Sequence, residues 1–252
     1  MWRERECNGG RAAVPASGPP RIRPPGRPPR HFAGRRRDLS NNCVRQPFSR
    51  SEVGLYKSVV LANRLNLFWG LDWAGIPEHL DTKRRLDGVD IVIGCVDTRA
   101  ARATIAKCAE EWSEVDYWLD LGNNADSGQF VLGEPLNRRN RRRRLRPRTV
   151  SELFPEVIQG ALDGDGLPSC SAAEALDRQE PFVNPTLANH ALALLARLFR
   201  YGTIFSHGGF VSLSSLSTFQ ALRVDPKHWQ WFRSRGRFPK NLLKPMPVLV
   251  TP

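Results

Sequence analysis

The stretch VDIVIGCVD, residues 89–97, decides the fold expected for this chain. Its short continuous run of β-branched residues is typical of a strand buried on both faces of a parallel sheet. The residues that follow predict a helix at about Thr98–Trp112, then the strand YWLDLGN (117–123) and the Gly-led strand GQFVLG (128–133). Strand, helix and strand in this order indicate a βαβ unit, so we expect an α/β protein with a doubly wound sheet.

Helices are predicted on both sides of this unit. Upstream, a helix should begin at Ser51 and end at Gly70, with one apolar face formed by Val53, Tyr56, Val60, Leu61, Leu65 and Phe68. Downstream, SELFPEVI (151–158) and Ala172–Arg178 predict short helices. The best-defined helix of the second part is expected at about Pro185–Arg200, capped by Asn184, with an apolar stripe of Leu187, Ala191, Leu194, Leu195 and Leu198. HGGFVSL (207–213) should form a strand.

The positive charge is concentrated in two segments. The net charge of +13 taken whole suggests a nucleic-acid binder. Residues 1–37 and residues 138–148 carry +8 each, however, which leaves −3 on the rest of the chain. The first segment, rich in Arg, Pro and Gly, predicts a disordered tail. The second predicts an exposed loop that cannot pack in a core and that separates residues 38–137 from residues 149–252, which end in an aromatic tail.

The composition also narrows the class of protein. No run of about 18 apolar residues occurs, so we expect a cytoplasmic protein that does not bind a membrane. The cysteines form no CxxC pair, so neither a disulfide framework nor zinc is expected. They are Cys7, Cys43, Cys95, Cys108 and Cys170, of which Cys95 and Cys108 are expected to be packing residues. His190 and His207 are expected to be hydrogen-bonded or exposed rather than ligands.

Charged side chains flank the central strand. Asp97 ends it, at the sheet edge where open α/β sheets bind ligands, and a carboxylate there suits magnesium on a nucleotide's phosphates. The alternative is that Asp97 caps the next helix. Upstream, Asn42, Arg45 and Lys57 offer an amide and two cations that can converge on a polyphosphate. Surface charge is the default interpretation of either cation alone.

These motifs together resemble a known superfamily. Asn-x-x-Arg-Gln from Asn42, a lysine on the following helix, and Cys-x-Asp-x-x-x-x-Arg from Cys95 are similar to the adenylation domain of ThiF, MoeB, HesA and ubiquitin-activating enzymes. The stretch from Asn42 to Trp229 more narrowly resembles the ThiF family protein of plasmid-borne PRTRC systems. The resemblance implies a Rossmann-like doubly wound sheet of the ThiF/MoeB type.

The resemblance also implies a reaction and its participants. Such an enzyme binds ATP and Mg²⁺ and adenylates the C-terminal carboxylate of a ubiquitin-like protein. Arg45 and Lys57 would bind the phosphates and stabilise their developing charge, Asn42 and Thr98 would help hold the nucleotide, and Asp97 would hold the metal. Homodimerisation is a further implication. Arg102 is expected either to orient Asp97 or to form a structural salt bridge.

A thiol step is a further expectation, because some relatives pass the activated carboxyl group to a cysteine. Cys170, which precedes a predicted helix, is the candidate, since a helix N-terminus lowers a thiol's pKa. The alternative is a loop cysteine without a catalytic role.

The main departure from the family is the absence of a strand–GxGGxG–helix segment before Asn42. Backbone amides of such a turn receive the phosphates. We therefore expect the sheet to be incomplete at its N-terminal βαβ unit and the chain to bind ATP poorly. One explanation is that residues 1–38 are an out-of-frame or misassigned start that replaces the true beginning of the protein. The other is that the chain is a truncated relic or pseudoenzyme. The alternatives in other functional classes are a nucleic-acid-associated protein that uses the Arg-rich segments and a non-catalytic scaffold for a ubiquitin-like partner.

Overall fold

The computed structural model describes residues 14–15, 31–33, 48–82, 86, 88–111, 114–143, 145–163, 180–214, 217–227 and 229, with backbone alone for the first two ranges. Its main sheet has five strands in the order β4-β5-β6-β8-β9. β4 and β5 are parallel, and the remaining neighbours are antiparallel. These strands are β4 (Ile91–Gly94), β5 (Tyr117–Asn123), β6 (Ser127–Gly133), β8 (Ser206–Ser212) and β9 (Thr218–Arg223). The predicted α/β class is confirmed.

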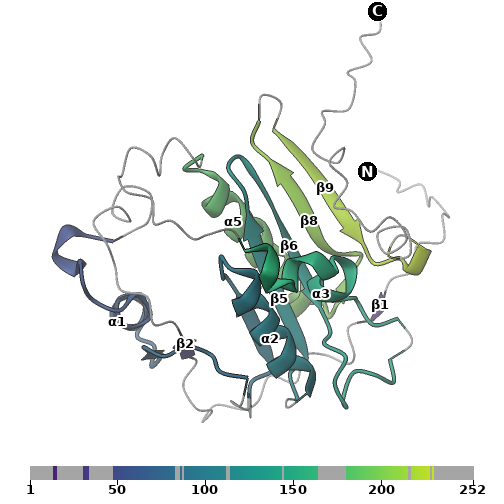
Figure 1. Ribbon diagram of the computed structural model, residues 1–252, viewed down its shortest axis with the longest axis horizontal. Coiled ribbons are helices and arrows are strands. Elements are labelled where there is room, and N and C mark those ends of the chain that lie inside the picture. Colours follow the sequence, from purple (N-terminus) through teal and green to yellow (C-terminus); the bar gives the residue numbers. More distant parts are fainter. Residues whose placement is uncertain are drawn as a thin grey trace, which may run out of the picture.

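Helices cover both faces of this sheet (Figure 1). On the near face in that view lie α2 (Arg99–Glu111) and α3 (Val150–Leu153), and on the far face lies α5 (Val183–Tyr201). All seven residues of β6 are consequently buried. The apolar core between the layers includes Trp118, Leu119, Val131, Leu132, Leu153, Leu187, Leu198 and Leu222. Strands from both sides of the Arg-rich segment share this sheet.

The predicted βαβ unit is present as β4, α2 and β5, but its first strand is less buried than expected. Among the described strands, β4 pairs with β5 alone, in a register that sets Gly94 opposite Asp120. Ile93 is therefore 51% exposed. The prediction that this strand is buried on both faces is wrong, because its burial depends on a second neighbour that the described residues do not supply.

The α5 helix matches its predicted apolar stripe but not its predicted start. Leu187, Ala191, Leu195 and Leu198 are buried against the sheet. The helix begins at Val183 with Phe182 as N-cap, so Asn184 does not cap it. The Asn184 Oδ1 atom instead accepts a hydrogen bond of 2.6 Å from Asn123 at the end of β5.

The first predicted helix is shorter than expected. The backbone forms a 3₁₀ turn, η2 (Arg50–Glu52), and α1 then runs from Lys57 to Trp69. Gly54, with φ of +92°, breaks the helix that was predicted from Ser51. The predicted apolar face is only partly confirmed: Val60 is buried as expected, but Phe68 is 76% exposed, and Ser58 and Ala62 are buried instead. Gly70 ends α1 in the left-handed conformation, as expected (φ 63°).

Short elements complete the fold. α1 packs against β2 (His31–Ala33) and β3 (Ala74–Ile76), which are parallel to each other. β1 (Val14–Pro15) pairs antiparallel with β7 (Thr203–Ile204). The prediction of a wholly disordered tail at residues 1–37 is thus wrong for β1 and β2. Two 3₁₀ turns, η3 (Pro155–Ile158) and η4 (Gly160–Leu162), follow α3, and the predicted helix at 172–178 lies outside the described residues.

Candidate functional site

The loop that joins β4 to α2 carries Asp97 and Thr98, two of the three described residues expected to contact a nucleotide or a metal. Asp97 is exposed, and Thr98 precedes the first residue of α2. Thr98 Oγ1 accepts a hydrogen bond of 3.3 Å from the Ala101 amide. Thr98 therefore caps α2, whereas the alternative expectation from the sequence was that Asp97 caps this helix. An exposed carboxylate at the end of a parallel strand fits Mg²⁺, which usually binds one or two protein carboxylates.

The N-terminus of α2 already binds a carboxylate of the chain itself. The two oxygens of Asp163 accept hydrogen bonds from the Arg99 amide at 2.8 Å and the Ala100 amide at 3.0 Å. These backbone bonds lower the pKa of Asp163, so the group is anionic at neutral pH. Free amides and the helix dipole at a helix N-terminus favour an anion. A phosphate that binds here must displace Asp163 or lie beside it.

A buried ion pair supports the same loop from below. Arg102 Nε donates to both carboxylate oxygens of Asp120, at 2.9 and 3.1 Å, and Arg102 Nη2 donates to the Val96 carbonyl at 3.1 Å. Burial raises the pKa of Asp120, and Arg102 opposes that shift. Of the two expectations for Arg102, the structural salt bridge is confirmed. Its partner is Asp120, and its hydrogen bond to Val96 holds the residue next to Asp97.

The other predicted site residues are not brought to this loop. Lys57 begins α1, where its Nζ atom lies 5.3 Å from the centre of the Phe48 ring. Figure 1 shows α1 beside β2, well apart from α2, so the structure does not bring Lys57 to Asp97. Asn42, Arg45 and Cys170 lie outside the described residues.

The cysteines and histidines of the described region are structural where they are buried. Cys108 is fully buried, as predicted, whereas Cys95 is exposed, so its predicted packing role is wrong. His207 is buried and hydrogen-bonded, as expected. Its Nδ1 atom lies 2.8 Å from the Leu132 carbonyl, and its Nε2 atom accepts a 2.9 Å hydrogen bond from Trp229. Trp229 is therefore a core residue.

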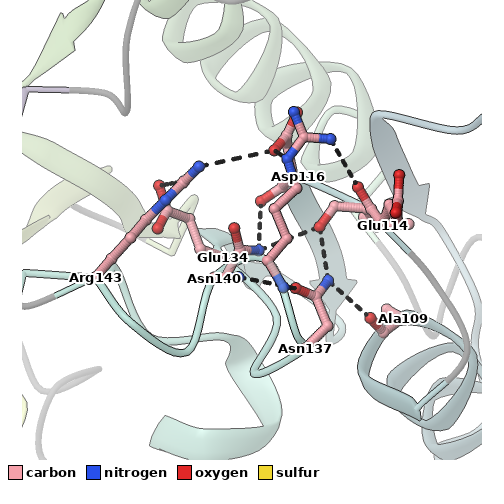
Figure 2. A network of polar contacts seen from close by, with 9 residues as sticks. Ala109, Glu114, Asp116, Glu134, Asn137, Asn140 and Arg143 are labelled. Carbon is pink, nitrogen blue, oxygen red and sulfur yellow. Dashed lines mark hydrogen bonds and ion pairs between the residues drawn. The ribbon is translucent and has the colours of Figure 1, made fainter.

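The segment 138–148 is folded rather than wholly exposed, which corrects the prediction that it cannot pack. Arg146 is 4% exposed and Asn140 is fully buried. Asn137 Nδ2 donates to the carbonyls of Val115 at 2.8 Å and Ala109 at 3.3 Å (Figure 2). Asn140 Nδ2 donates to Val115 at 3.1 Å and Asp116 at 3.2 Å. The two asparagines thereby attach the loop to the segment between α2 and β5.

Ion pairs explain how the arginines of this segment become buried. Arg143 Nη1 lies 2.8 Å from Glu134 Oε1, and Arg139 Nε lies 2.9 Å from Asp116 Oδ1 (Figure 2). The atoms are not aligned for hydrogen bonds, so these contacts are ion pairs. Burial raises the pKa of both Asp116 and Glu134, and the arginines oppose the shift. The sequence signal that was missed is the pair of asparagines, three residues apart, of which Asn137 directly precedes the arginine run and Asn140 lies inside it.

A second group of pairs forms around Glu152 at the start of α3. Arg146 donates to Glu152 at 2.5 and 2.7 Å, and Arg148 donates to it at 2.9 Å. Arg146 also contacts the Glu134 carbonyl. Burial opposes ionisation of Glu152, but the hydrogen bonds of the two arginines and of the Thr149 amide prevail and lower its pKa. Glu152 thus stabilises the folded loop as an anion.

We expect Glu152→Gln to lower the free energy of unfolding at pH 7 by about 1.5–3 kcal/mol, as for hydrogen bonds to charged groups. A glutamate whose pKa is lower in the folded chain stabilises the fold at pH values above its unfolded pKa of about 4.3. This stabilisation is lost as the pH falls through the pKa of the folded state. The stability difference between Glu152→Gln and the unchanged chain should therefore shrink below about pH 4.3. Urea unfolding from pH 3 to 7 measures it, with Glu156→Gln as control; a difference that is constant across this range would contradict the role of Glu152.

Two searches of the described residues gave negative results. No group of three or more His, Cys, Asp or Glu side chains there is arranged to hold a metal ion. No helix in the same ranges combines the length and apolar character needed to cross a membrane. Comparison of the sequence with protein-family models and with curated proteins found no match.

Proposed function

We propose that this chain is a ThiF-type activating protein that adenylates the C-terminal carboxylate of a ubiquitin-like protein with ATP. The observation that carries the proposal is the unit β4–α2–β5, in which parallel strands flank a helix and Asp97 lies in the loop that follows the carboxyl end of the first strand. Ligands of open α/β sheets bind at this end of the strands. The Rossmann-like sheet of the ThiF/MoeB type belongs to the same proposal.

The chain's own residues have distinct tasks in this proposal. Asp97 would hold Mg²⁺, which when bound would neutralise charge on the polyphosphate. Arg102 and Asp120 would fix the loop through the hydrogen bond to Val96. Thr98 holds the first turn of α2, and Asn42 and Arg45 would stabilise charge on the phosphates. Cys170 would accept the activated carboxyl group if a thioester forms.

The reaction should be slow in this chain. The sequence contains no GxGGxG turn, whose amides would otherwise receive the phosphates. The carboxylate of Asp163 occupies the amides at the start of α2, which lie next to Asp97. Both features weaken phosphate binding relative to a preformed anion site.

A calorimetric titration of the full chain with MgATP tests the nucleotide site. We expect a Kd in the millimolar range, which corresponds to about −4 kcal/mol. Asp97→Ala should weaken binding at least about tenfold, since it removes the carboxylate proposed to hold the metal. Asp126→Ala, in the exposed turn between β5 and β6, is the matched control and should leave Kd unchanged. Tight binding, or equal binding by the two variants, would show that the assignment of Asp97 is wrong.

A further inference from the structure

Three arginines of the folded loop take no part in its ion pairs. Arg138, Arg141 and Arg142 are exposed, and within the described ranges no ion pair or hydrogen bond involves their side chains. The described arginines of the loop therefore form two sets. One set, Arg139, Arg143, Arg146 and Arg148, folds the loop against carboxylates, and the other three residues, the exposed trio, face solvent.

The carboxylates near the loop are already neutralised. Asp116 pairs with Arg139 and with Arg143, which lie at 2.9 and 3.8 Å, and Glu134 pairs with Arg143 at 2.8 Å. Glu152 pairs with Arg146 and Arg148. These three acids thus have four arginine partners. The three positive charges of the exposed trio are not compensated within the loop.

The trio is attached to a fixed backbone. Arg138 lies two residues before Asn140 and Arg141 directly after it, and the Asn140 side chain is fully buried and donates to the carbonyls of Val115 and Asp116. The Asn137 Oδ1 atom accepts hydrogen bonds from the amides of Arg139 at 3.1 Å and Asn140 at 3.0 Å, which fixes the turn itself. A partner that contacts the trio therefore orders the arginine side chains but not the backbone. Preorganisation of this kind lowers the cost of binding.

We propose that the exposed trio binds the phosphate backbone of nucleic acid without regard to sequence. Every basic residue between Glu134 and Glu152 is an arginine, and the guanidinium fork matches two phosphate oxygens, which an ammonium group does not. Contacts with phosphates position a protein on nucleic acid but do not distinguish bases. This binding is independent of the proposed adenylation.

A nucleic acid fits the trio better than an anionic membrane does. A membrane-surface segment combines basic residues with a continuous apolar face. Among the described residues of segment 134–148, Leu136 is the exposed large apolar side chain. A single such residue does not form a continuous apolar face. The trio therefore has the charge that either partner requires but lacks the apolar area that a bilayer requires.

The salt dependence of binding to duplex DNA tests the proposal. Fluorescence anisotropy of a labelled duplex of about 20 base pairs, titrated with the full chain at about 50 to 200 mM salt, gives the slope of log K against log[salt]; each phosphate contact contributes about −0.9 to it. The variant R138A/R141A/R142A should flatten the slope by about 2.7 and weaken binding at least about tenfold at low salt. Other basic residues of the chain account for slope that remains.

Two control variants separate a site from general charge. R197A/R200A/R223A removes three exposed arginines from α5 and β9 and should change the slope little. R138K/R141K/R142K keeps the charge and should restore most of the slope, with weaker binding because the fork is lost. The urea midpoints of all three variants should match that of the unchanged chain, since none of these arginines is paired with a carboxylate among the described residues.

Three outcomes would overturn the proposal. The first is a slope that is unchanged in R138A/R141A/R142A, and the second is an equal loss in R197A/R200A/R223A. The third is binding to phosphatidylserine vesicles but not to DNA, which would assign the trio to a membrane surface. A second duplex of unrelated sequence should bind with the same Kd; a difference of about tenfold or more would contradict recognition through phosphates alone.

Discussion

Replacing Arg102 with Met should lower the free energy of unfolding by about 3–5 kcal/mol, because it leaves Asp120 as an uncompensated charge in the core. Both side chains are buried, and Arg102 Nε contacts both carboxylate oxygens of Asp120, at 2.9 and 3.1 Å. The same change releases the Val96 carbonyl, next to Asp97. Urea unfolding at pH 7 measures the loss.

The double variant R102M/D120L provides the matched control. Apolar residues of similar volume often replace a buried ion pair at little cost, so the double variant should recover most of the stability lost by Arg102→Met. Its MgATP affinity should stay low, because the loop lacks the hydrogen bond to Val96. If Arg102→Met costs less than about 1 kcal/mol, the pair is solvated and the account of the loop is wrong.

Leu198→Ala should destabilise the protein by about 2–5 kcal/mol, the range for removing a large apolar side chain from a packed core. Leu198 is 0% exposed and lies on the face of α5 that covers the sheet. Leu192→Ala, on the same helix, is the matched control because Leu192 is 58% exposed. The control should change stability by less than about 0.5 kcal/mol. Thermal and urea unfolding of the two variants should therefore differ clearly, and similar losses would contradict the assigned orientation of α5.

The sequence predicted the elements whose signal is local. β5 begins with a short apolar run, and its bounds are those predicted. α5 carries an apolar stripe, and it begins two residues before and ends one residue after its predicted bounds. The start of α1 was mispredicted because apolar spacing continued through Gly54, whose backbone breaks the helix. The burial of Ile93 was also mispredicted, since burial depends on which strands lie beside β4 and not on its own residues.

The candidate site shows the same limit. The sequence predicts Asp97 at the end of a strand, and the structure has it three residues beyond β4, in the loop before α2. The partner of Arg102 was not predictable from spacing, since Asp120 lies 18 residues further along the chain. The carboxylate of Asp163 is 64 residues from the Arg99 amide that it caps. The Arg-rich loop was called exposed for this reason too: its acids, Asp116 and Glu134, precede it and come near only in the folded chain.

ATP–pyrophosphate exchange tests the central proposal most directly. The full chain is incubated with ATP, Mg²⁺, labelled pyrophosphate and a small ubiquitin-like protein that has a free C-terminal carboxylate. We predict slow exchange that disappears with Asp97→Ala and with a C-terminally amidated partner, and that persists with Asp126→Ala. Exchange that is absent with the free carboxylate, or that is equal with the amidated partner, would contradict adenylation by this chain.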